Sequence, residues 1–412
     1  MKYVIIGNGP AAISCIEGIR TVDANGGITV ISKEDHPAYF RPLISYYLEG
    51  KSKADNIYCR RADFYEKNGC AVVNGEVTAI DKDKNTVTLK SGEEIAYDKL
   101  CICTGSSPFV PPMKGLETVE NKFTFLTIDD SYAIEKAIDK DSRALIIGAG
   151  LIGLKCAEGL RDRVKSVTVC DLAPRVLSSI LDDECAAIVQ KHLEDCGISF
   201  SLGNTAEHFE GNTAYMKDGS VIDFDILVLA LGVRPNIGFF KDAGGDCGRA
   251  IIVDNSMKTS IDNIYAAGDC VEQYDISFGD KRIMALLPNA NLGGHTAGVN
   301  MAGGEVLFDN AVPMNSIGFW GLHMMTAGTY ANDENAEMIE KKGEKSIKRF
   351  FVKDNKLVGF IIIGDVKSAG IYTNLVRTQA DLSGLDTEAL LQNPNLLPFS
   401  ENYRRKKLRG VV

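Results

Sequence analysis

The sequence lacks several features that would each point to a particular class of protein. No apolar run reaches the ~18 residues that a membrane-spanning helix requires. No basic and apolar leader precedes the first expected strand, at residues 2–6. The net charge is −10, which disfavours non-specific binding to nucleic acid. We therefore expect a cytoplasmic protein that binds neither a membrane nor nucleic acid.

The eleven cysteines and five histidines form no recognisable metal or redox motif. There is no Cys-x-x-Cys and no zinc-like spacing, and most cysteines fall inside expected strands and helices. Scattered thiols of this kind are typical of reduced, structural cysteines in a reducing compartment. We expect no metal site, and a catalytic thiol is the alternative interpretation of the cysteines.

What the sequence has instead is one glycine-rich pattern that occurs twice. Residues 5–12 read IIGNGPAA and residues 146–153 read IIGAGLIG. Each copy follows a short apolar strand and opens a helix, the context in which such glycines bind a dinucleotide. The first glycine makes the turn, the second leaves room for a pyrophosphate at the helix N-terminus, and Ala12 or Gly153 lets the helix lie close to the strand. The repeat predicts two dinucleotides, one bound and one visiting; two ordinary tight turns are the alternative.

An acid distinguishes the second copy from the first. The strand at residues 166–170 ends on Asp171, about twenty residues after the glycines. A carboxylate at this place can bind a ribose 2′-hydroxyl and repel a 2′-phosphate. The pattern favours NAD over NADP, and an acid that caps the following turn is the alternative.

The length of 412 residues is too great for one core and fits two or three domains. Prolines at residues 108–112 mark a boundary, and a second βαβ unit occupies about residues 114–242. Small antiparallel meanders are expected at 75–89 and 213–222, and the segment 36–43 is expected to be a rigid loop beside a ligand. Strands at 316–321, 346–352 and 357–364 and a helix at 368–381 would form a third domain without a glycine pattern.

The order of these landmarks resembles the pyridine nucleotide-disulfide oxidoreductase superfamily. The matching motifs are Gly7-x-Gly9-x-x-Ala12, Thr104-Gly105, Gly148-x-Gly150-x-x-Gly153, ALGVRP at 230–235 and AAGD at 266–269. Segments 40–45 and 358–365 look like the rubredoxin reductases and the flavoprotein portion of assimilatory nitrite reductases. The resemblance implies an α/β fold with two Rossmann-like dinucleotide-binding domains and a small α+β C-terminal domain. The FAD domain would comprise residues 1–112 and 243–312, the NAD domain 113–242, and the C-terminal domain, with a basic tail, 313–412.

The resemblance also implies which residues hold tightly bound FAD. Ser32 stands where relatives often have the ribose acid, and Glu34 follows two residues later. The implied contacts are Gly7, Gly9, Pro10 and Ala11 at the pyrophosphate, Glu34 at a ribose, Arg41 and Pro42 at a phosphate or the flavin edge, Val77 at the adenine, Thr104 and Gly105 beside the flavin, Asp269 at a ribityl or phosphate-linked hydroxyl, and Asn289 in a helix whose positive end faces the flavin. Trp320 either lies near the flavin or packs in a core.

The second site is implied to admit NADH, with NADPH disfavoured. Its residues would be Gly148, Gly150, Leu151, Ile152, Gly153, Asp171 and Gly232. Where relatives place a glutamate on the following helix, near the nicotinamide and flavin, this chain has Lys155. We hypothesise a catalytic role in which Lys155 stabilises reduced, anionic flavin or pairs with an acid elsewhere. A solvent-facing lysine is the alternative.

Disulfide reduction is disfavoured, because no Cys-x4-Cys follows the first glycine pattern and residues 44–48 contain no cysteine. The resemblance therefore implies an NADH-dependent FAD flavoprotein reductase that passes electrons to an external acceptor, such as the small acidic iron–sulfur carriers rubredoxin or ferredoxin. The alternatives are an NADH oxidase, a flavoprotein subunit of a larger redox complex, and a flavin-based redox sensor or docking protein. The basic residues 404–409 form either a frayed terminus or a docking patch for an acidic partner, and a homodimer is left open.

Overall fold

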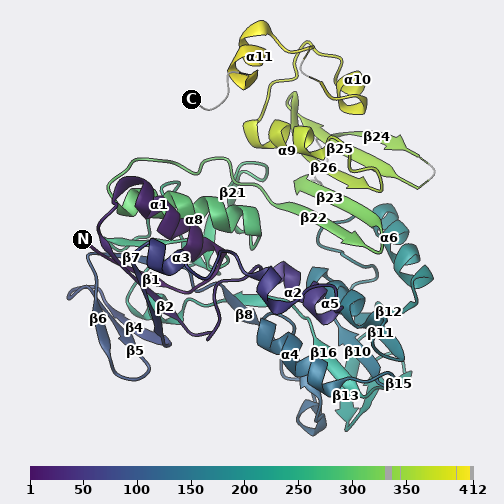
Figure 1. The fold of residues 1–412 in the computed structure, drawn as a ribbon. Coiled ribbons are helices and arrows are strands. Elements are labelled where there is room, and N and C mark those ends of the chain that lie inside the picture. The colour runs from purple at the N-terminus through teal and green to yellow at the C-terminus, as the bar shows by residue number, and fades with distance from the viewer. Residues whose placement is uncertain (330–335, 344, 396, 409–412) are drawn as a thin grey trace. The chain divides into compact units, whose positions relative to one another are not determined.

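The computed structural model describes residues 1–329, 336–343, 345–395 and 397–408, with side chains as far as residue 405 (Figure 1). Contacts divide the chain into two compact units. The first unit comprises Met1–Tyr274 and Lys281–Asp309, and the second comprises Asp275–Asp280 and Asn310–Val412. In the part of the chain that the structure describes, no helix is both long and apolar enough to cross a membrane.

Two five-stranded parallel sheets organise the first unit. Their central strands are almost wholly buried, as expected for parallel sheets with helices on both faces. Sheet 1 has the strand order β19 (Ile264–Ala266), β7 (Lys99–Ile102), β1 (Lys2–Ile6), β2 (Gly27–Ser32) and β3 (Cys70–Asn74). Sheet 2 has the order β12 (Ile198–Leu202), β11 (Ser166–Asp171), β10 (Arg143–Ile147), β16 (Ile226–Leu229) and β9 (Lys122–Phe123).

The two glycine patterns occupy equivalent places in the two sheets. Helix α1 (Pro10–Val22) follows β1, and helix α5 (Leu151–Arg161) follows β10. The Gly7 N–H donates to the Ile31 carbonyl at 2.8 Å, and the Gly148 N–H donates to the Cys170 carbonyl at 2.7 Å. The expected strand–turn–helix context is therefore present in both copies, and the predicted α/β class is confirmed.

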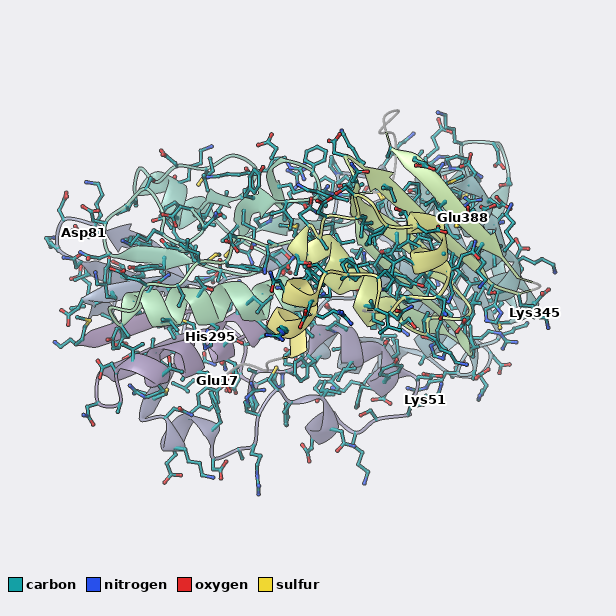
Figure 2. All side chains as sticks on the ribbon, turned by 90° about the horizontal axis from the view of Figure 1, so that it is seen from above. Glu17, Lys51, Asp81, His295, Lys345 and Glu388 are labelled. Carbon is teal, nitrogen blue, oxygen red and sulfur yellow. The ribbon has the colours of Figure 1, made fainter. Side chains whose placement is uncertain are left out.

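Glycines allow α1 to lie against helix α8 (Leu287–Met301) with almost no space between the two backbones (Figure 1). A Cβ atom at Gly294 would lie 2.1 Å from the Ala11 carbonyl oxygen, and one at Gly298 would lie 2.1 Å from the Cys15 carbonyl oxygen. Figure 2 labels Glu17 and His295, which belong to this helix pair. No larger residue fits at either glycine unless the helices separate.

Short strands and helices complete the first unit. The segment 36–43 is not a loop throughout: Arg41–Leu43 form a 3-10 turn, because Pro42 has the backbone angle that a helical first turn needs and the chain continues directly into α2. The smaller elements are the meanders β4 (Val77–Asp81), β5 (Thr86–Leu89), β6 (Glu94–Ala96) and β13 (Ala206–Glu210), β14 (Thr213–Met216), β15 (Val221–Asp223); the ribbon β8 (Ser106–Pro108) and β17 (Val233–Pro235); β18 (Ile251–Ile252), β20 (Val271–Asp275) and β21 (Asp280–Ile283); and helices α2 (Ile44–Leu48), α3 (Phe64–Lys67), α4 (Ile128–Ala137), α6 (Asp183–Asp195) and α7 (Gly238–Asp242).

The second unit is an antiparallel sheet covered by helices. The sheet has the order β22 (Met314–Phe319), β23 (Leu322–Gly328), β26 (Lys356–Ile363), β25 (Ile347–Lys353) and β24 (Glu337–Lys342), and the helices are α9 (Ala369–Thr378), α10 (Thr387–Gln392) and α11 (Glu401–Leu408). Phe350, Phe360 and Tyr372 form the centre of its core. The sequence predicted only part of this sheet, since β23 and β24 were not among the expected strands.

The basic tail is described in part. Residues 401–408 form α11, in which Arg405 pairs with Glu401 at 2.7 Å. The side chains of Lys406 and Lys407, and all of Arg409, lie outside the described part of the chain.

Candidate dinucleotide-binding sites

The first glycine pattern forms an open cradle at the N-terminus of α1. Gly7 has a φ of +105°, and a Cβ there would lie 2.1 Å from the Cys103 carbonyl oxygen, so the turn requires glycine. A Cβ at Gly9 would meet nothing within 4 Å, which leaves the space that a pyrophosphate would fill. No side chain caps the helix at Gly9, and Pro10 lacks an N–H, so the next backbone N–H groups are left to bind an anion.

The second cradle repeats this geometry at the N-terminus of α5. Gly148 has a φ of +121°, and a Cβ there would lie 2.2 Å from the Ala230 carbonyl oxygen. Gly150 again borders open space and serves as an uncapped N-cap before Leu151 and Ile152. A Cβ at Gly153 would lie 1.9 Å from the Gly148 carbonyl oxygen, so the third glycine is needed for packing. Both cradles therefore fit a dinucleotide pyrophosphate.

Asp171 lies directly against the second cradle. Its carboxylate accepts the Ala149 N–H at 2.6 Å and the Ala173 N–H at 2.7 Å. Strand register makes Ser32 the equivalent position in sheet 1, and the Ser32 hydroxyl donates to the Glu34 carbonyl at 2.7 Å. The two cradles thus differ in charge at the place where an adenosine ribose would lie.

Glu34, the displaced acid of the first site, is engaged by neighbouring side chains. The Tyr39 hydroxyl donates to one Glu34 oxygen at 2.5 Å, and Arg41 forms an ion pair with the other. Arg41 also acts electrostatically on Asp269, whose pKa is raised by burial and partly lowered by the guanidinium. Arg41, in the segment after β2, and Asp269, in the AAGD motif, therefore place opposite charges in one region. Pro42 beside them is exposed.

The Thr104-Gly105 turn is fixed by a residue that the sequence analysis missed. Asn236 donates from its amide nitrogen to the Thr104 carbonyl at 3.0 Å and from its backbone to the Gly105 carbonyl at 3.0 Å. The Thr104 hydroxyl donates to the Asn236 carbonyl at 2.7 Å. Gly232, just before strand β17, accepts the Phe109 N–H at 2.9 Å. The only sequence signal for this tie is that Asn236 directly follows the ALGVRP motif.

Asn289 and Val77 lie at the ends of regular elements. Asn289 is 3% exposed in the first turn of α8, which has Pro288 at its start and no side-chain cap. The predicted helix at this place is present, and its N-terminal donors fit an acceptor atom. Val77 is buried at the start of β4.

Lys155 is not a solvent-facing lysine. Its side chain is 18% exposed, and it forms an ion pair with Glu158, which is 5% exposed and one turn further along α5. The ammonium also lies 4.8 Å from the centroid of the Tyr46 ring on α2. The acid partner that the sequence left unnamed is therefore Glu158. Its signal in the sequence was only the i,i+3 spacing, which places both side chains on one face of the helix.

Trp320 belongs to the second unit, where it forms the two-residue turn between β22 and β23. Its φ of +42° and that of Gly321, +90°, give the left-handed backbone that tight hairpins need. A bulky residue adopts this conformation rarely.

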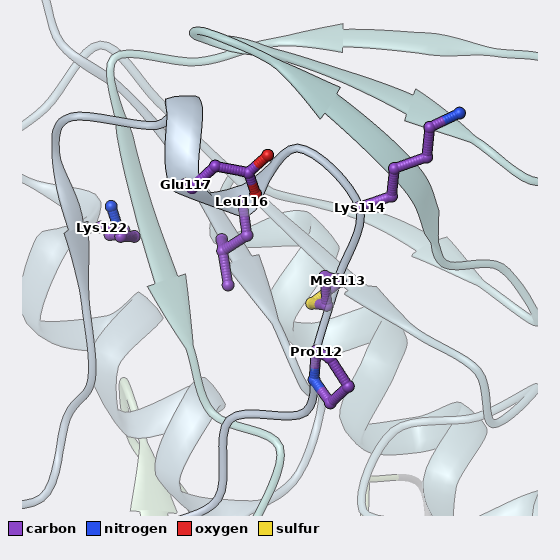
Figure 3. A pocket seen from close by; sticks show the side chains of 6 residues that line it. All are labelled: Pro112, Met113, Lys114, Leu116, Glu117 and Lys122. Atoms are coloured by element: carbon purple, nitrogen blue, oxygen red, sulfur yellow. The ribbon is translucent and has the colours of Figure 1, made fainter.

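An open cavity of about 510 Å³ lies apart from both cradles (Figure 3). It is lined by Pro112, Met113, Lys114, Leu116, Glu117 and Lys122. The Lys122 ammonium donates to the Val119 carbonyl at 2.7 Å, so this cation has a hydrogen-bond partner within the protein. None of the expected dinucleotide contacts lines this cavity.

Most of the cysteines are buried thiols. None of the eleven forms a disulfide. Burial raises the pKa of Cys59, Cys170 and Cys270 to about 12, which keeps these thiols protonated and poorly nucleophilic. Among the described residues, no group of three or more His, Cys, Asp or Glu side chains is arranged to hold a metal ion.

Comparison with known proteins gives the family. Residues 1–294 match the family model of the pyridine nucleotide-disulphide oxidoreductases, and residues 313–380 match that of the rubredoxin NAD+ reductase C-terminal domain. The chain belongs to the pyridine nucleotide-disulphide oxidoreductase family. This is a family of FAD- and NADH-dependent oxidoreductases, so the membership that the motifs implied is confirmed.

Three relatives illustrate the range of the family. The chain is 36% identical to an NADH oxidase of Methanocaldococcus jannaschii over 90% of this chain and 89% of the relative. It is 31% identical to the epsilon subunit of the NADH-dependent phenylglyoxylate dehydrogenase of Aromatoleum evansii, over 93% of each chain. The crystal structure of NADH:rubredoxin oxidoreductase from Clostridium acetobutylicum superimposes with a TM-score of 0.76 at 25% identity, covering 95% of this chain and 99% of that one.

Proposed function

We propose that this chain is a reductase that takes electrons from NADH and delivers them to a small, acidic iron–sulfur protein such as rubredoxin or ferredoxin. The observation that carries the proposal is the match of residues 313–380 to the rubredoxin NAD+ reductase C-terminal domain. The chemistry of α2 supports it, because Ile44–Leu48 contains no thiol that would receive electrons within the protein. The acceptor must then come from outside.

We assign FAD to the cradle of sheet 1, in a domain formed by residues 1–112 and 243–312. FAD supplies a centre that accepts two electrons and releases them singly. Open Gly9 and the N-terminus of α1 hold the pyrophosphate, Arg41 balances its charge, and Asp269 accepts a hydroxyl hydrogen bond. The Thr104-Gly105 turn and the N-terminus of α8 with Asn289 frame the ring system. The remaining proposed contacts are Gly7, Ala11, Glu34, Pro42 and Val77.

We assign NADH to the cradle of sheet 2, in a domain formed by residues 113–242, with the C-terminal domain beginning at residue 313. Gly148–Gly153 hold the pyrophosphate, and Gly232 borders the site. Asp171 already accepts two backbone N–H groups beside the cradle, so its carboxylate is fixed where it would meet a ribose 2′-hydroxyl and repel a 2′-phosphate. We assign Lys155, on α5, the role of balancing the negative charge of reduced flavin, with Glu158 as its ion-pair partner.

Rapid mixing of the flavin-loaded protein with NADH or NADPH tests the electron donor. The reduced protein is then mixed with rubredoxin, ferredoxin, oxygen or a disulfide. We expect faster reduction by NADH, and reoxidation fastest with rubredoxin or ferredoxin. Turnover with the acidic carrier should fall as salt rises, because the encounter is electrostatic. Fast reoxidation by oxygen alone, with no response to either carrier, would refute the proposed acceptor.

A deletion of residues 404–412 tests the role of the basic tail separately. If the tail docks the carrier, turnover of the truncated protein with the carrier should depend less on salt concentration, while its rate of reduction by NADH stays unchanged. An unchanged salt dependence would exclude the tail from docking and leave the acceptor assignment intact.

A second candidate is a flavoprotein subunit within a larger redox complex. The name of the Aromatoleum evansii relative, a dehydrogenase subunit matched over 93% of each chain, favours it. Purification of the chain from its own cells under mild conditions would separate the two candidates. Co-migration with a fixed set of other chains favours the subunit, and a chain that migrates alone and reduces rubredoxin favours the carrier reductase.

A further inference from the structure

Segment 34–48, which follows β2 of sheet 1, contains α2, and α2 lies beside helix α4, which follows β9 of sheet 2 (Figure 1). Hydrogen bonds join this segment to α4. At the start of α4, the Ile128 N–H donates to the Tyr39 hydroxyl at 3.1 Å. This N–H is one of the helix donors that has no partner within the helix itself. The Arg41 guanidinium donates to the Leu126 carbonyl, also at 3.1 Å. A side chain of one nucleotide-binding half therefore caps a helix of the other.

A second tie lies towards the end of the same helix. The Tyr47 hydroxyl donates to the Glu135 carboxylate on α4. Arg163, just after α5, donates to the other Glu135 oxygen at 3.1 Å and to the Leu48 carbonyl at 2.7 Å. The end of α2 is thus bound by both α4 and the turn after α5. We call these two sets of bonds the Tyr39 staple and the Tyr47 staple.

Each staple depends on a neutral tyrosine hydroxyl. Tyr39 accepts from Ile128 and Arg41 and donates to Glu34, so its hydroxyl has two donors and one acceptor around it. Burial raises the pKa of Tyr39, and burial with the Glu135 hydrogen bond raises the pKa of Tyr47 to about 12. Both hydroxyls remain protonated at neutral pH. Removal of the oxygen alone would delete the tyrosine bonds of each staple with little change in side-chain volume, and would leave the arginine bonds in place.

We propose that Tyr39 and Tyr47 are positioning residues that set the distance between the two bound dinucleotides. Hydride transfer requires the reacting atoms to approach within about 3–3.5 Å. Each cradle belongs to a different sheet, so this distance depends on how firmly the two halves are held together. Arg41 is a proposed FAD contact and also belongs to the Tyr39 staple. One side chain would therefore contact FAD and also hold the start of α4. The inference rests on the proposed FAD and NADH cradles and not on the acceptor.

The test uses a matched set of tyrosine-to-phenylalanine variants in the flavin-loaded protein: Tyr39→Phe, Tyr47→Phe, the double variant, and Tyr58→Phe as the control. Tyr58 pairs with Tyr39 through the backbone and acts electrostatically on Tyr132 of α4, but its hydroxyl makes no hydrogen bond to α4 within the described chain, so the variant controls for the loss of a nearby hydroxyl without the loss of such a bond. Two readouts are needed: the limiting rate of flavin reduction with the dissociation constant for NADH, and hydrogen exchange over residues 124–137.

We expect each single variant to lower the limiting rate by between ~10-fold and ~100-fold while NADH affinity is unchanged, because misplacement by about 1 Å costs up to ~100-fold. Exchange should rise at the start of α4 in Tyr39→Phe and towards its end in Tyr47→Phe, whereas Tyr58→Phe should match the parent. Faster exchange with an unchanged rate would overturn the inference, because the staples would then be structural only. Unchanged exchange in both variants would overturn it as well. A parent protein that NADH fails to reduce would instead refute the proposed cradles.

Discussion

Replacing Lys155 by methionine should destabilise the protein far more than the same change at a helix-surface lysine, because it would remove the ammonium that pairs with the buried Glu158 carboxylate. Glu158 is 5% exposed and Lys155 is 18% exposed. Breaking a buried ion pair from one side costs about 3–5 kcal/mol. Since Lys155 retains some contact with water, we expect a loss near the lower limit, about 3 kcal/mol, which corresponds to a fall in melting temperature of ~3–4 °C in a chain of 412 residues.

The double variant Lys155→Met/Glu158→Gln should recover most of this loss. Replacement of a whole buried pair by side chains of similar volume is often neutral, so we expect about 1 kcal/mol for the double variant. Glu158→Gln alone should cost about 1 kcal/mol, because the remaining ammonium still faces the Tyr46 ring. The coupling between the two positions is then about 3 kcal/mol. Lys155→Glu is a poorer probe, since it would place two carboxylates on the same buried helix face.

Urea unfolding of the flavin-loaded variants, followed by circular dichroism and flavin fluorescence, measures these differences. Glu17 offers a matched control, because it occupies the equivalent helix position in the first copy and pairs with Arg60 at the surface, where the two side chains are 36% and 40% exposed. Glu17→Gln should change stability by less than about 1 kcal/mol. A Lys155→Met variant that loses no more than Glu17→Gln would refute the buried-pair argument.

Three further predictions follow from the cradles. Gly150→Ala should fold normally and lose NADH affinity, because its Cβ would enter the open space that we assign to the pyrophosphate. Gly153→Ala should be unstable, because its Cβ would lie 1.9 Å from the Gly148 carbonyl oxygen. Thermal melts measure the stability of the two variants, and titrations measure their affinity for NADH. Asp171→Ala should weaken NADH binding and reduce the preference for NADH over NADPH. The ratio of the kcat/KM values for NADH and NADPH measures this preference. Asp269 has a pKa raised by burial, so the folded state binds its proton more tightly and its contribution to stability falls as pH rises above the unfolded value. Asp269→Asn should therefore raise the apoprotein melting temperature at neutral pH and lower FAD affinity; a lower melting temperature would contradict this.

The sequence predicted the two cradles because their physical requirements are local. The turn at Gly7 and the open space at Gly9 depend on residues within one strand–turn–helix unit and on backbone atoms of a neighbouring strand. The same logic gave Asp171, which ends the next strand. Secondary structure that depends on local patterns, such as α1, α5 and the start of α8, was therefore predictable.

The sequence did not predict bonds that join distant segments. Asn236 meets Thr104 across 132 residues, and Tyr39 meets Ile128 across 89. No local period or motif specifies such a partner, because it depends on the packing of two complete sheets. The strand β24 was missed for a different reason, since its alternation is interrupted by charged residues on an exposed edge.

The two helices that carry the cradles are held by different contacts, which we compare under the proposed assignment of FAD to the first cradle and NADH to the second. Helix α1 lies against α8, where Gly294 and Gly298 bring the two backbones into contact. Such a contact leaves little room for movement and suits a cofactor that stays bound. Helix α5 meets α2 at two places: Gly159 packs closely against Leu48 and the Ser45 carbonyl, and the Lys155 ammonium lies over the Tyr46 ring. Together with the Tyr47 staple at the end of α2, this contact holds α5 in place, so under the proposed assignment NADH enters a cradle whose position is already set.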